Sequence, residues 1–398
     1  MDNHTKILIP FGEGQEIVFA ATVAGAAVSV DLTDSLNCVL AEDVFADTDM
    51  PPFNKSAMDG YACRKEDLGN ELLIIDEILA GSVPQKMIGQ NQCARIMTGA
   101  MVPEGADFVL MKEFAEKAGI NTIICSKLSD QANICYRAED ITKGELMLTK
   151  GTLIKPPHIA VLASIGIDRP LVFSRPSVAV ISTGNELVEP SVIPQLQQIR
   201  NSNGFQLMAQ LKAMGISPDY LGILKDSEPE VMSGLESSIQ KYEIVLISGG
   251  VSVGDYDFVP AVLNRLGAKI LLHGLNVKPG KHLLFARLGN RSIFGLPGNP
   301  VSSLVQFELL VKPFILKQMG CARIPGELKL PMAAGFRRQK ADSLLFVPVT
   351  LTEEGTVLPL EYHGSAHIHA YSGDDGILEI PVGQHEMKKG EIVHVRQL

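Results

Sequence analysis

Residues 242–260, YEIVLISGGVSVGDYDFVP, decide the fold. The stretch opens with a short and mostly β-branched apolar run, residues 244–247, which is typical of a strand buried on both faces of a parallel sheet. Serines and glycines follow, and Asp255 and Asp257 precede a predicted helix over residues 258–266. This order of strand, glycine-rich turn and acidic helix start predicts a place for a phosphate and its cation. The alternative is a tight turn in which an Asp caps the helix.

Strands and helices alternate on both sides of this stretch. Strands are predicted at residues 177–182, 220–224, 244–247, 269–276, 282–288 and 291–296. Helices are predicted around residues 207–214, 228–240, 258–266 and 300–319, the last interrupted at Pro313. Since such alternation builds a parallel sheet with helices on both faces, we expect a central, doubly wound and mostly parallel α/β domain over residues 176–325.

Further domains are expected around the central one, because 398 residues are too many for one ordinary core. Residues 46–144 are predicted to form an inserted β-rich domain, with strands at 71–75, 93–97, 108–111 and 122–126. Residues 1–45 together with 145–175 are predicted to form a mixed α/β, elongated domain, with a helix at 158–165. Residues 326–398 are predicted to form a small β-barrel-like domain, with strands at 328–332, 344–351, 376–380 and 392–395.

The composition is that of a globular protein, with 46% hydrophobic and 20% charged residues. The net charge of -10 disfavours a protein that wraps nucleic acid or coats an anionic membrane. Six scattered cysteines without a C-x-x-C pair indicate reduced thiols. The first residues do not resemble a secretory signal and no apolar run reaches membrane-spanning length, so we expect a cytoplasmic protein.

Four loops are expected beyond the carboxyl ends of the predicted strands, where open α/β sheets bind their ligands. Each loop alone is typical of a turn, but four at one edge of a sheet favour a binding site. The residues that these loops would offer to a ligand are Ser182, Thr183, Gly184, Ser248, Gly249, Gly250, Ser252, Gly254, Pro279, Gly280, Pro297, Gly298 and Asn299.

The charged residues of these loops suit a diphosphate. Lys278 and Lys281 would neutralise phosphate charge. Glu186 and Asp257 offer the hard oxygen ligands that Mg²⁺ prefers when it bridges phosphate oxygens. The Ser248 loop lacks the G-x-S-x-G and P-loop patterns, which disfavours a serine hydrolase and a P-loop ATPase. The first α/β turn has one glycine, which disfavours a dinucleotide-binding fold.

Three other features allow two interpretations each. Asp59, in SAMDGYA, stands either in an Asx-turn or in an exposed catalytic loop, and the residues alone favour the turn. The same holds for Thr98 in MTGA and for Asp140. The histidines at 363, 367 and 369 could imitate a transition-metal site, but such a cluster is usually part of the surface.

Seven motifs occur in the order found in one family: PPFNKSAMDGYA, MTGA, RAEDI, ISTGNEL, SGGVSVGDYD, KPGK and GLPGNPVSS. Through them essentially the whole chain resembles the molybdopterin molybdenumtransferases, the MoeA-type proteins, and the C-terminal domain of gephyrin. The resemblance implies four domains, with a MogA-like molybdopterin-binding domain in the centre, and an elongated homodimer whose cleft involves both subunits. It also implies a reaction in which adenylylated molybdopterin and molybdate, with a divalent cation, give molybdenum cofactor and AMP. A molybdopterin adenylyltransferase and proteins of molybdoenzyme maturation would be the protein partners.

The resemblance assigns roles to the charged residues of the loops. Asp257 and Glu186 would position Mg²⁺ and the pterin phosphate, and Lys278 and Lys281 would offset the charge of phosphate or molybdate.

Five more residues match positions of the family. Asp59, Thr98 and Asp140 would close the cleft from the partner subunit. Asp226 matches an acid that follows a strand, and Ser365 matches a serine of the C-terminal domain that would contact the oxyanion.

The sequence departs from the family's pattern at a few positions. Asn54 and Lys55 replace the usual acidic and polar pair, and His282 stands where the KPGK loop usually continues with proline. Gly274 occupies a position that is often basic, so the cleft has one positive charge fewer unless His273 substitutes for it. A tungstate-inserting variant, a non-catalytic molybdopterin-binding or scaffolding paralogue and a generic phosphotransferase are therefore kept as alternatives.

Overall fold

The structure is a computed structural model that describes residues 8–252, 257–323 and 326–398. The chain divides into two compact units. Unit 1 consists of Met1–Glu42, Lys150–Ile159 and Arg169–Leu398, and unit 2 consists of Asp43–Thr149 and Ala160–Asp168. Each unit has its own six-stranded sheet, and unit 1 has a second one, so the units are described separately. The division into four domains stays a prediction.

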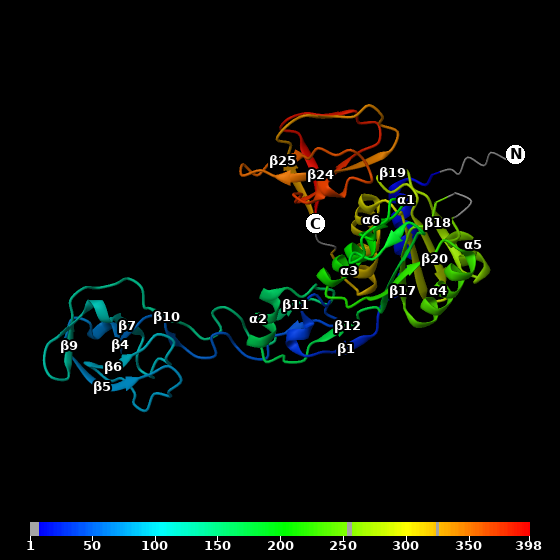
Figure 1. Ribbon diagram of the computed structural model, residues 1–398. Coiled ribbons are helices and arrows are strands. Elements are labelled where there is room, and N and C mark those ends of the chain that lie inside the picture. The colour runs from blue at the N-terminus through cyan, green and yellow to red at the C-terminus, as the bar shows by residue number, and fades with distance from the viewer. Residues whose placement is uncertain (1–7, 253–256, 324–325) are drawn as a thin grey trace. The chain divides into compact units, whose positions relative to one another are not determined.

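The central sheet of unit 1 contains β13 (Val178–Thr183), β16 (Asp219–Leu224), β17 (Ile244–Ser248), β18 (Lys269–His273), β20 (Leu284–Leu288) and β21 (Arg291–Leu296) (Figure 1). Its strand order is β16-β13-β17-β21-β20-β18. β13, β16, β17 and β21 pair in parallel, and β20 is antiparallel to both of its neighbours. β18 therefore runs in the same direction as β21, and five of the six strands end at one edge. The predicted mostly parallel sheet is confirmed.

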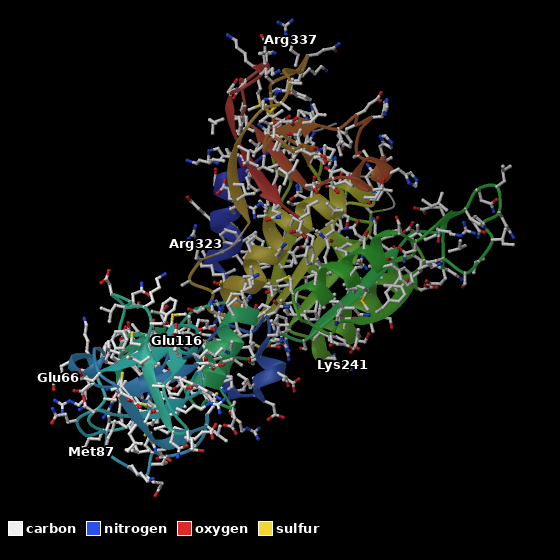
Figure 2. The ribbon with its side chains drawn as sticks, turned by 90° about the vertical axis from the view of Figure 1, so that its left-hand side faces the viewer. Glu66, Met87, Glu116, Lys241, Arg323 and Arg337 are labelled. Atoms are coloured by element: carbon white, nitrogen blue, oxygen red, sulfur yellow. The ribbon has the colours of Figure 1, made fainter. Side chains whose placement is uncertain are left out.

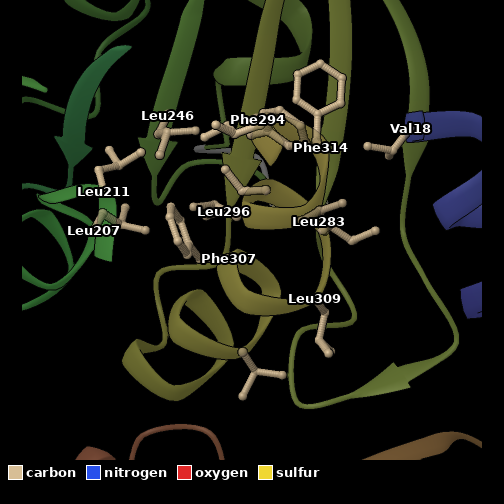
Figure 3. Packing of buried hydrophobic residues seen from close by; sticks show 14 of the residues in the cluster. Val18, Leu207, Leu211, Leu246, Leu283, Phe294, Leu296, Phe307, Leu309 and Phe314 are labelled. Carbon is tan, nitrogen blue, oxygen red and sulfur yellow. The ribbon is translucent and has the colours of Figure 1, made fainter. Parts of the chain in front are cut away.

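Helices cover both faces of this sheet, and the strand residues alternate between two cores. The helices of unit 1 are α1 (Phe11–Ala20), α3 (Asn203–Ala213), α4 (Glu228–Lys241), α5 (Val259–Arg265), α6 (Pro300–Gln306) and α7 (Lys312–Gln318). Ile244 and Leu246 pack in a core with α3 and α6, whereas Val245 and Ile247 pack in a core with α4 and α5. Figure 3 shows part of the first core, in which Leu246 and Phe294 are fully buried. Because β17 is buried on both faces, it reads as one continuous apolar run.

The end of the last long helix differs from the prediction. The predicted interruption at Pro313 is wrong, because the irregular part lies earlier, in the π-helical segment Phe307–Val311. Pro313 stands in the first turn of α7. A proline has no N–H for the carbonyl of Leu309, and its ring would collide with that carbonyl in an α-helix, so a wider π turn before Pro313 relieves the conflict.

The strand predicted at residues 269–276 is also too long. β18 ends at His273, and Gly274 has a positive φ of 102°. The chain then forms the short strand β19 (Val277–Lys278), which pairs in parallel with β24 of the C-terminal sheet. Lys278 thereby lies next to Leu345 in register.

The C-terminal part of unit 1 is an all-β structure, as predicted. Its strands are β22 (Glu327–Pro331), β23 (Phe336–Arg337), β24 (Leu344–Leu351), β25 (Val357–Pro359), β26 (Gly376–Ile380), β27 (Glu386–Met387) and β28 (Ile392–Gln397), with a 3₁₀ turn at Ile368–Tyr371. The main sheet has the order β19-β24-β26-β28-β22. Val347, Leu378 and Val395 form its buried core. Unit 1 also contains the pairs β1 (Ala27–Ser29) with β12 (Leu171–Phe173) and β14 (Leu187–Val188) with β15 (Ile199–Arg200), and a 3₁₀ turn at Leu32–Ser35.

Unit 2 is rich in short strands, as predicted. The sheet order β7-β4-β6-β5-β9-β8 joins Phe108–Met111, Gly60–Cys63, Gln92–Ile96, Leu72–Ile78, Thr122–Cys125 and Ala115–Lys117. Shorter pairs join β2 (Val44–Phe45) to β11 (Leu146–Leu148) and β3 (Lys55–Ser56) to β10 (Ile134–Cys135), and 3₁₀ turns lie at Lys65–Asp67 and Lys112–Phe114. Helix α2 (Pro156–Ser164) starts at the predicted proline pair. β4 has no apolar run, but a Cβ at Gly60 would collide with the carbonyl of Leu110, so only glycine fits between these strands.

The surface carries the charged side chains, as Lys241 and Arg337 illustrate (Figure 2). All six cysteines are free thiols, of which Cys38, Cys63 and Cys93 are buried and the others half-buried. Burial raises the pKa of Cys63 to about 12. Among the described residues, no helix is long and apolar enough to cross a membrane.

Candidate active site

A cavity of about 540 Å³ lies at the carboxyl edge of the central sheet. Three of the four predicted loops line it. The predicted residues in its wall are Thr183, Glu186, Ser248, Gly250, Ser252, Asp257, Pro297, Gly298 and Asn299. The cavity thus combines two carboxylates, several hydroxyl groups and the start of α6, which can bind a phosphate together with a cation.

The fourth loop lines an adjoining cavity of about 370 Å³. Its wall includes Lys278, Pro279, Gly280, Lys281 and Ser365. The two cavities share His282, Pro297 and Asn299, so they adjoin at one wall. A ligand with an acidic and a cationic neighbour at its two ends would fit across this wall.

Three of the predicted loop residues have structural contacts instead of a place in either wall. Ser182 is fully buried and its Oγ donates to Asn201 Oδ1 at 3.2 Å. Gly249 has a φ of 96°, and a Cβ there would collide with the carbonyl of Thr183. Gly184 precedes the Glu186 side chain, which lies within van der Waals reach of its Cα. Gly254 and Asp255 lie outside the described residues.

Asp226 follows β16 and holds the first loop in place. Its carboxylate accepts a hydrogen bond from Thr183 Oγ1 at 2.5 Å and one from the Asn185 N–H at 3.3 Å. The Asp226 N–H donates in turn to Asn185 Oδ1 at 3.2 Å. The carboxylate therefore orients Thr183, which lines the first cavity. The catalytic role predicted for Asp226 stays a prediction.

The sequence analysis missed two asparagines at the start of α3. Asn203 is almost fully buried, and its Nδ2 donates to Ser248 Oγ at 2.7 Å and to the Gly298 carbonyl at 2.8 Å. It therefore ties the loop after β17 to the loop after β21. Both asparagines line the first cavity. The run RNSNG that precedes the helix could have indicated them, because Asn side chains commonly bond to nearby backbone and loops.

Asn201 belongs to a buried polar chain beneath the same cavity. Its Oδ1 accepts from Ser182, and its Nδ2 donates to the Tyr220 hydroxyl at 2.8 Å. The Tyr220 hydroxyl donates to Glu189 at 2.8 Å. Burial and this carboxylate raise the pKa of Tyr220, so the tyrosine stays protonated and keeps donating.

The lysine loop carries the positive charge of the second cavity. Lys278 Nζ lies 3.6 Å from Asp342 Oδ1, and more than half of each side chain is exposed. Such an exposed pair stabilises by less than about 1 kcal/mol, so an anion can compete for the lysine. Ser365 Oγ accepts from Asn299 Nδ2 at 2.9 Å, which connects the two cavities through one hydrogen bond.

The histidines of the C-terminal part do not form a metal site. The Nδ1 atoms of His363 and His367 are 3.4 Å apart, and His363 Nε2 lies 3.3 Å from Glu361. Across the described part of the chain, no group of three or more His, Cys, Asp or Glu side chains could hold a metal ion. Glu186 and Asp257 nevertheless suit Mg²⁺, which is commonly bound by one or two carboxylates together with the phosphates of its substrate.

Asp59 and Thr98 lie together in unit 2. The Asp59 carboxylate accepts from the Thr98 N–H at 2.9 Å, from Thr98 Oγ1 at 2.8 Å and from Lys112 Nζ at 3.2 Å. These bonds, those of Thr98 first, lower the pKa of Asp59 to about 2. Asp140 lies in a different loop, where its N–H donates to the Met50 carbonyl at 3.0 Å and its side chain is exposed.

The fold and the paired cavities define a multidomain α/β protein that binds an anion at the carboxyl edge of its central sheet. Residues 9–166 match the family described as "MoeA N-terminal region (domain I and II)". Residues 179–317 match "Probable molybdopterin binding domain", and residues 329–398 match "MoeA C-terminal region (domain IV)".

Full-length relatives agree with these matches. The chain is 34% identical over 400 residues to a molybdopterin molybdenumtransferase of Staphylococcus aureus strain MSSA476, covering 97% of this chain and 95% of that protein. It is 36% identical over 378 residues to the Staphylococcus epidermidis strain RP62A protein of the same name, covering 92% and 90%. A crystal structure of a molybdopterin biosynthesis MoeA protein from Pyrococcus horikoshii OT3 matches with a TM-score of 0.82 at 28% identity, covering 98% and 100%. The chain belongs to the molybdopterin molybdenumtransferase family.

Proposed function

We propose that this protein inserts molybdenum from molybdate into adenylylated molybdopterin and releases molybdenum cofactor and AMP. Membership of the molybdopterin molybdenumtransferase family supports the reaction class. The observation that carries the proposal is the shared wall of the two cavities, where the acidic first cavity meets the lysine-lined second one. The diphosphate would lie in the first cavity and the molybdate in the second.

Glu186 and Asp257 would hold a divalent cation, for which we propose Mg²⁺. When bound, the cation neutralises charge on the diphosphate as the AMP group leaves. Ser248, Gly250 and Ser252, with the start of α6, would bind the phosphate oxygens through hydroxyl and N–H groups. Asn203 would keep this arrangement rigid through its bonds to Ser248 and Gly298.

Lys278 and Lys281 would bind the oxyanion, and Ser365 would donate a hydrogen bond to it. His282, in the shared wall, would contact both ligands. Gly274 offers no side chain where the family often has a basic one, so we expect weak molybdate binding at low concentrations of the anion. Tungstate has the same charge and shape, and we propose to assay it in parallel.

Asp59, Thr98 and Asp140 would complete the cleft from the second subunit of a homodimer. The support for Asp59 is that its carboxylate is ionised and held in one direction by three hydrogen bonds. We also propose a cytoplasmic location, and an adenylyltransferase and proteins of molybdoenzyme maturation as partners.

The test is AMP release by the purified protein. Adenylylated molybdopterin, Mg²⁺ and molybdate or tungstate are mixed with the enzyme, and AMP is measured by chromatography. We expect AMP that depends on both the oxyanion and Mg²⁺, and none in the presence of EDTA. Saturable pterin binding without AMP would contradict the enzyme and support a binding or scaffolding paralogue. ATP hydrolysis without any pterin would support a phosphotransferase instead.

A further inference from the structure

Gln306, the last residue of α6, lies directly beneath the lysine loop. It is fully buried, and its Nε2 donates to the carbonyl of Pro279 at 3.3 Å. Pro279 is 27 residues earlier in the chain and stands between the two lysines that line the second cavity. The hydrogen bond therefore connects the centre of the loop to the helix that starts at the shared wall.

Gly280 rests on the same side chain. A Cβ at Gly280 would overlap the amide of Gln306, and Gly280 has a positive φ of 103°. The backbone of the loop can approach the amide this closely because no side chain stands between them. The contact and the hydrogen bond together restrict the positions of Lys278 and Lys281 on either side.

The amide also has an unsatisfied atom. Within the described part of the chain, Gln306 Oε1 has no hydrogen-bond partner although it is buried. A buried acceptor without a partner is unfavourable, and a methionine of the same length would fill the same space without it. Packing alone therefore does not explain a glutamine here, whereas the hydrogen bond to the loop does.

We propose that Gln306 is a positioning residue, which holds the Lys278–Lys281 loop so that both ammonium groups face the oxyanion. This inference rests on the proposed function for the identity of the anion, but not for the restraint on the loop. Without the bond to Pro279 the loop would sample more conformations, and the anion would have to order it upon binding. The effect should fall on oxyanion binding and leave the step at the bound oxyanion unchanged.

The test compares Gln306→Met with the wild type and with Ser303→Ala. Methionine keeps the length and volume of the side chain and removes only its ability to donate. Ser303 is a buried residue of the same helix whose Oγ has no partner within the described residues, so its substitution controls for a general disturbance of α6. We expect Gln306→Met to raise the KM for molybdate about 5- to 10-fold with kcat changed less than about twofold. We expect Ser303→Ala to match the wild type, and we expect the conservative variant Gln306→His, which retains a donor, to recover part of the loss.

A second measurement does not require turnover. Hydrogen exchange of a peptide covering residues 275–284 should become faster in Gln306→Met and stay unchanged in Ser303→Ala, with equal melting temperatures for both. An unchanged KM for molybdate, or unchanged exchange in this peptide, would overturn the inference. If the wild type released no AMP but the peptide responded as expected, the proposed function would fail and the positioning role would stand.

Discussion

Hydrogen bonds keep the Asp59 carboxylate ionised. Its pKa is lowered from 3.8 to about 2, so the group is charged throughout the neutral and mildly acidic range. Because the folded-state pKa is depressed, the stabilisation from these bonds is present above pH 4 and is lost as the pH falls towards 2. An acidic decline of activity between pH 5 and 7 would therefore come from another group.

We predict that Asp59→Ala abolishes AMP release, with a loss of about 10²-fold or more, while the protein remains folded. The side chain is partly exposed and packs little, so the melting temperature should change by no more than a few degrees. Glu116→Ala, which removes an exposed carboxylate from strand β8 of the same unit, is the matched control and should retain full activity. Full activity of Asp59→Ala would remove Asp59 from the site.

The ion pair between Lys278 and Asp342 leads to a second prediction for a single residue. Asp342 competes with the oxyanion for the ammonium group, and the two atoms are 3.6 Å apart. Asp342→Asn should therefore lower the KM for molybdate about two- to threefold at low salt, and the gain should disappear in high salt. Lys278→Ala should change the KM in the opposite direction. A KM for molybdate that is the same in Asp342→Asn and wild type at every ionic strength would contradict the competition.

At the scale of elements, the order of strands and helices could be predicted because each element carries its own periodicity. The continuous apolar run of β17 and the regular faces of α3 and α4 are local signals. The pairing of β19 with β24 could not be predicted, since it joins two residues of one part to a sheet formed more than 60 residues later. The convergence of the loops followed from the direction of the strands, but the asparagine that ties them together did not, because its partners are 45 and 95 residues away.

Asn203 shows how one side chain connects two elements, and its loss should affect both stability and binding. In Asn203→Ala, Ser248 Oγ and the Gly298 carbonyl lose a buried donor. We expect the free energy of unfolding in urea to fall by about 1–3 kcal/mol and pterin binding to weaken. Asn264→Ala, an exposed amide on α5, is the control and should change neither quantity. If the unfolding free energy fell and the pterin affinity stayed the same, Asn203 would be structural only.

At the scale of the whole molecule, the two units contribute different parts of the proposed site. Lys278 and the paired cavities belong to unit 1, and Asp59 belongs to unit 2. A homodimer in which each cleft takes Asp59 from the partner subunit makes a prediction that a cleft within one chain does not. We expect Asp59→Ala and Lys278→Ala to be inactive alone and to regain activity when they are mixed after partial denaturation and refolding.

The amount of recovered activity follows from symmetry. Random pairing gives heterodimers in about half of the molecules, and each heterodimer has one intact cleft and one that lacks both residues, so about a quarter of the wild-type activity should return. A mixture of Asp59→Ala with wild type refolded in the same way controls for losses during refolding. If each cleft lay within one chain, every cleft in the mixture would lack one of the two residues and no activity would return. Sedimentation of the wild type as a monomer would contradict the shared cleft without further assay.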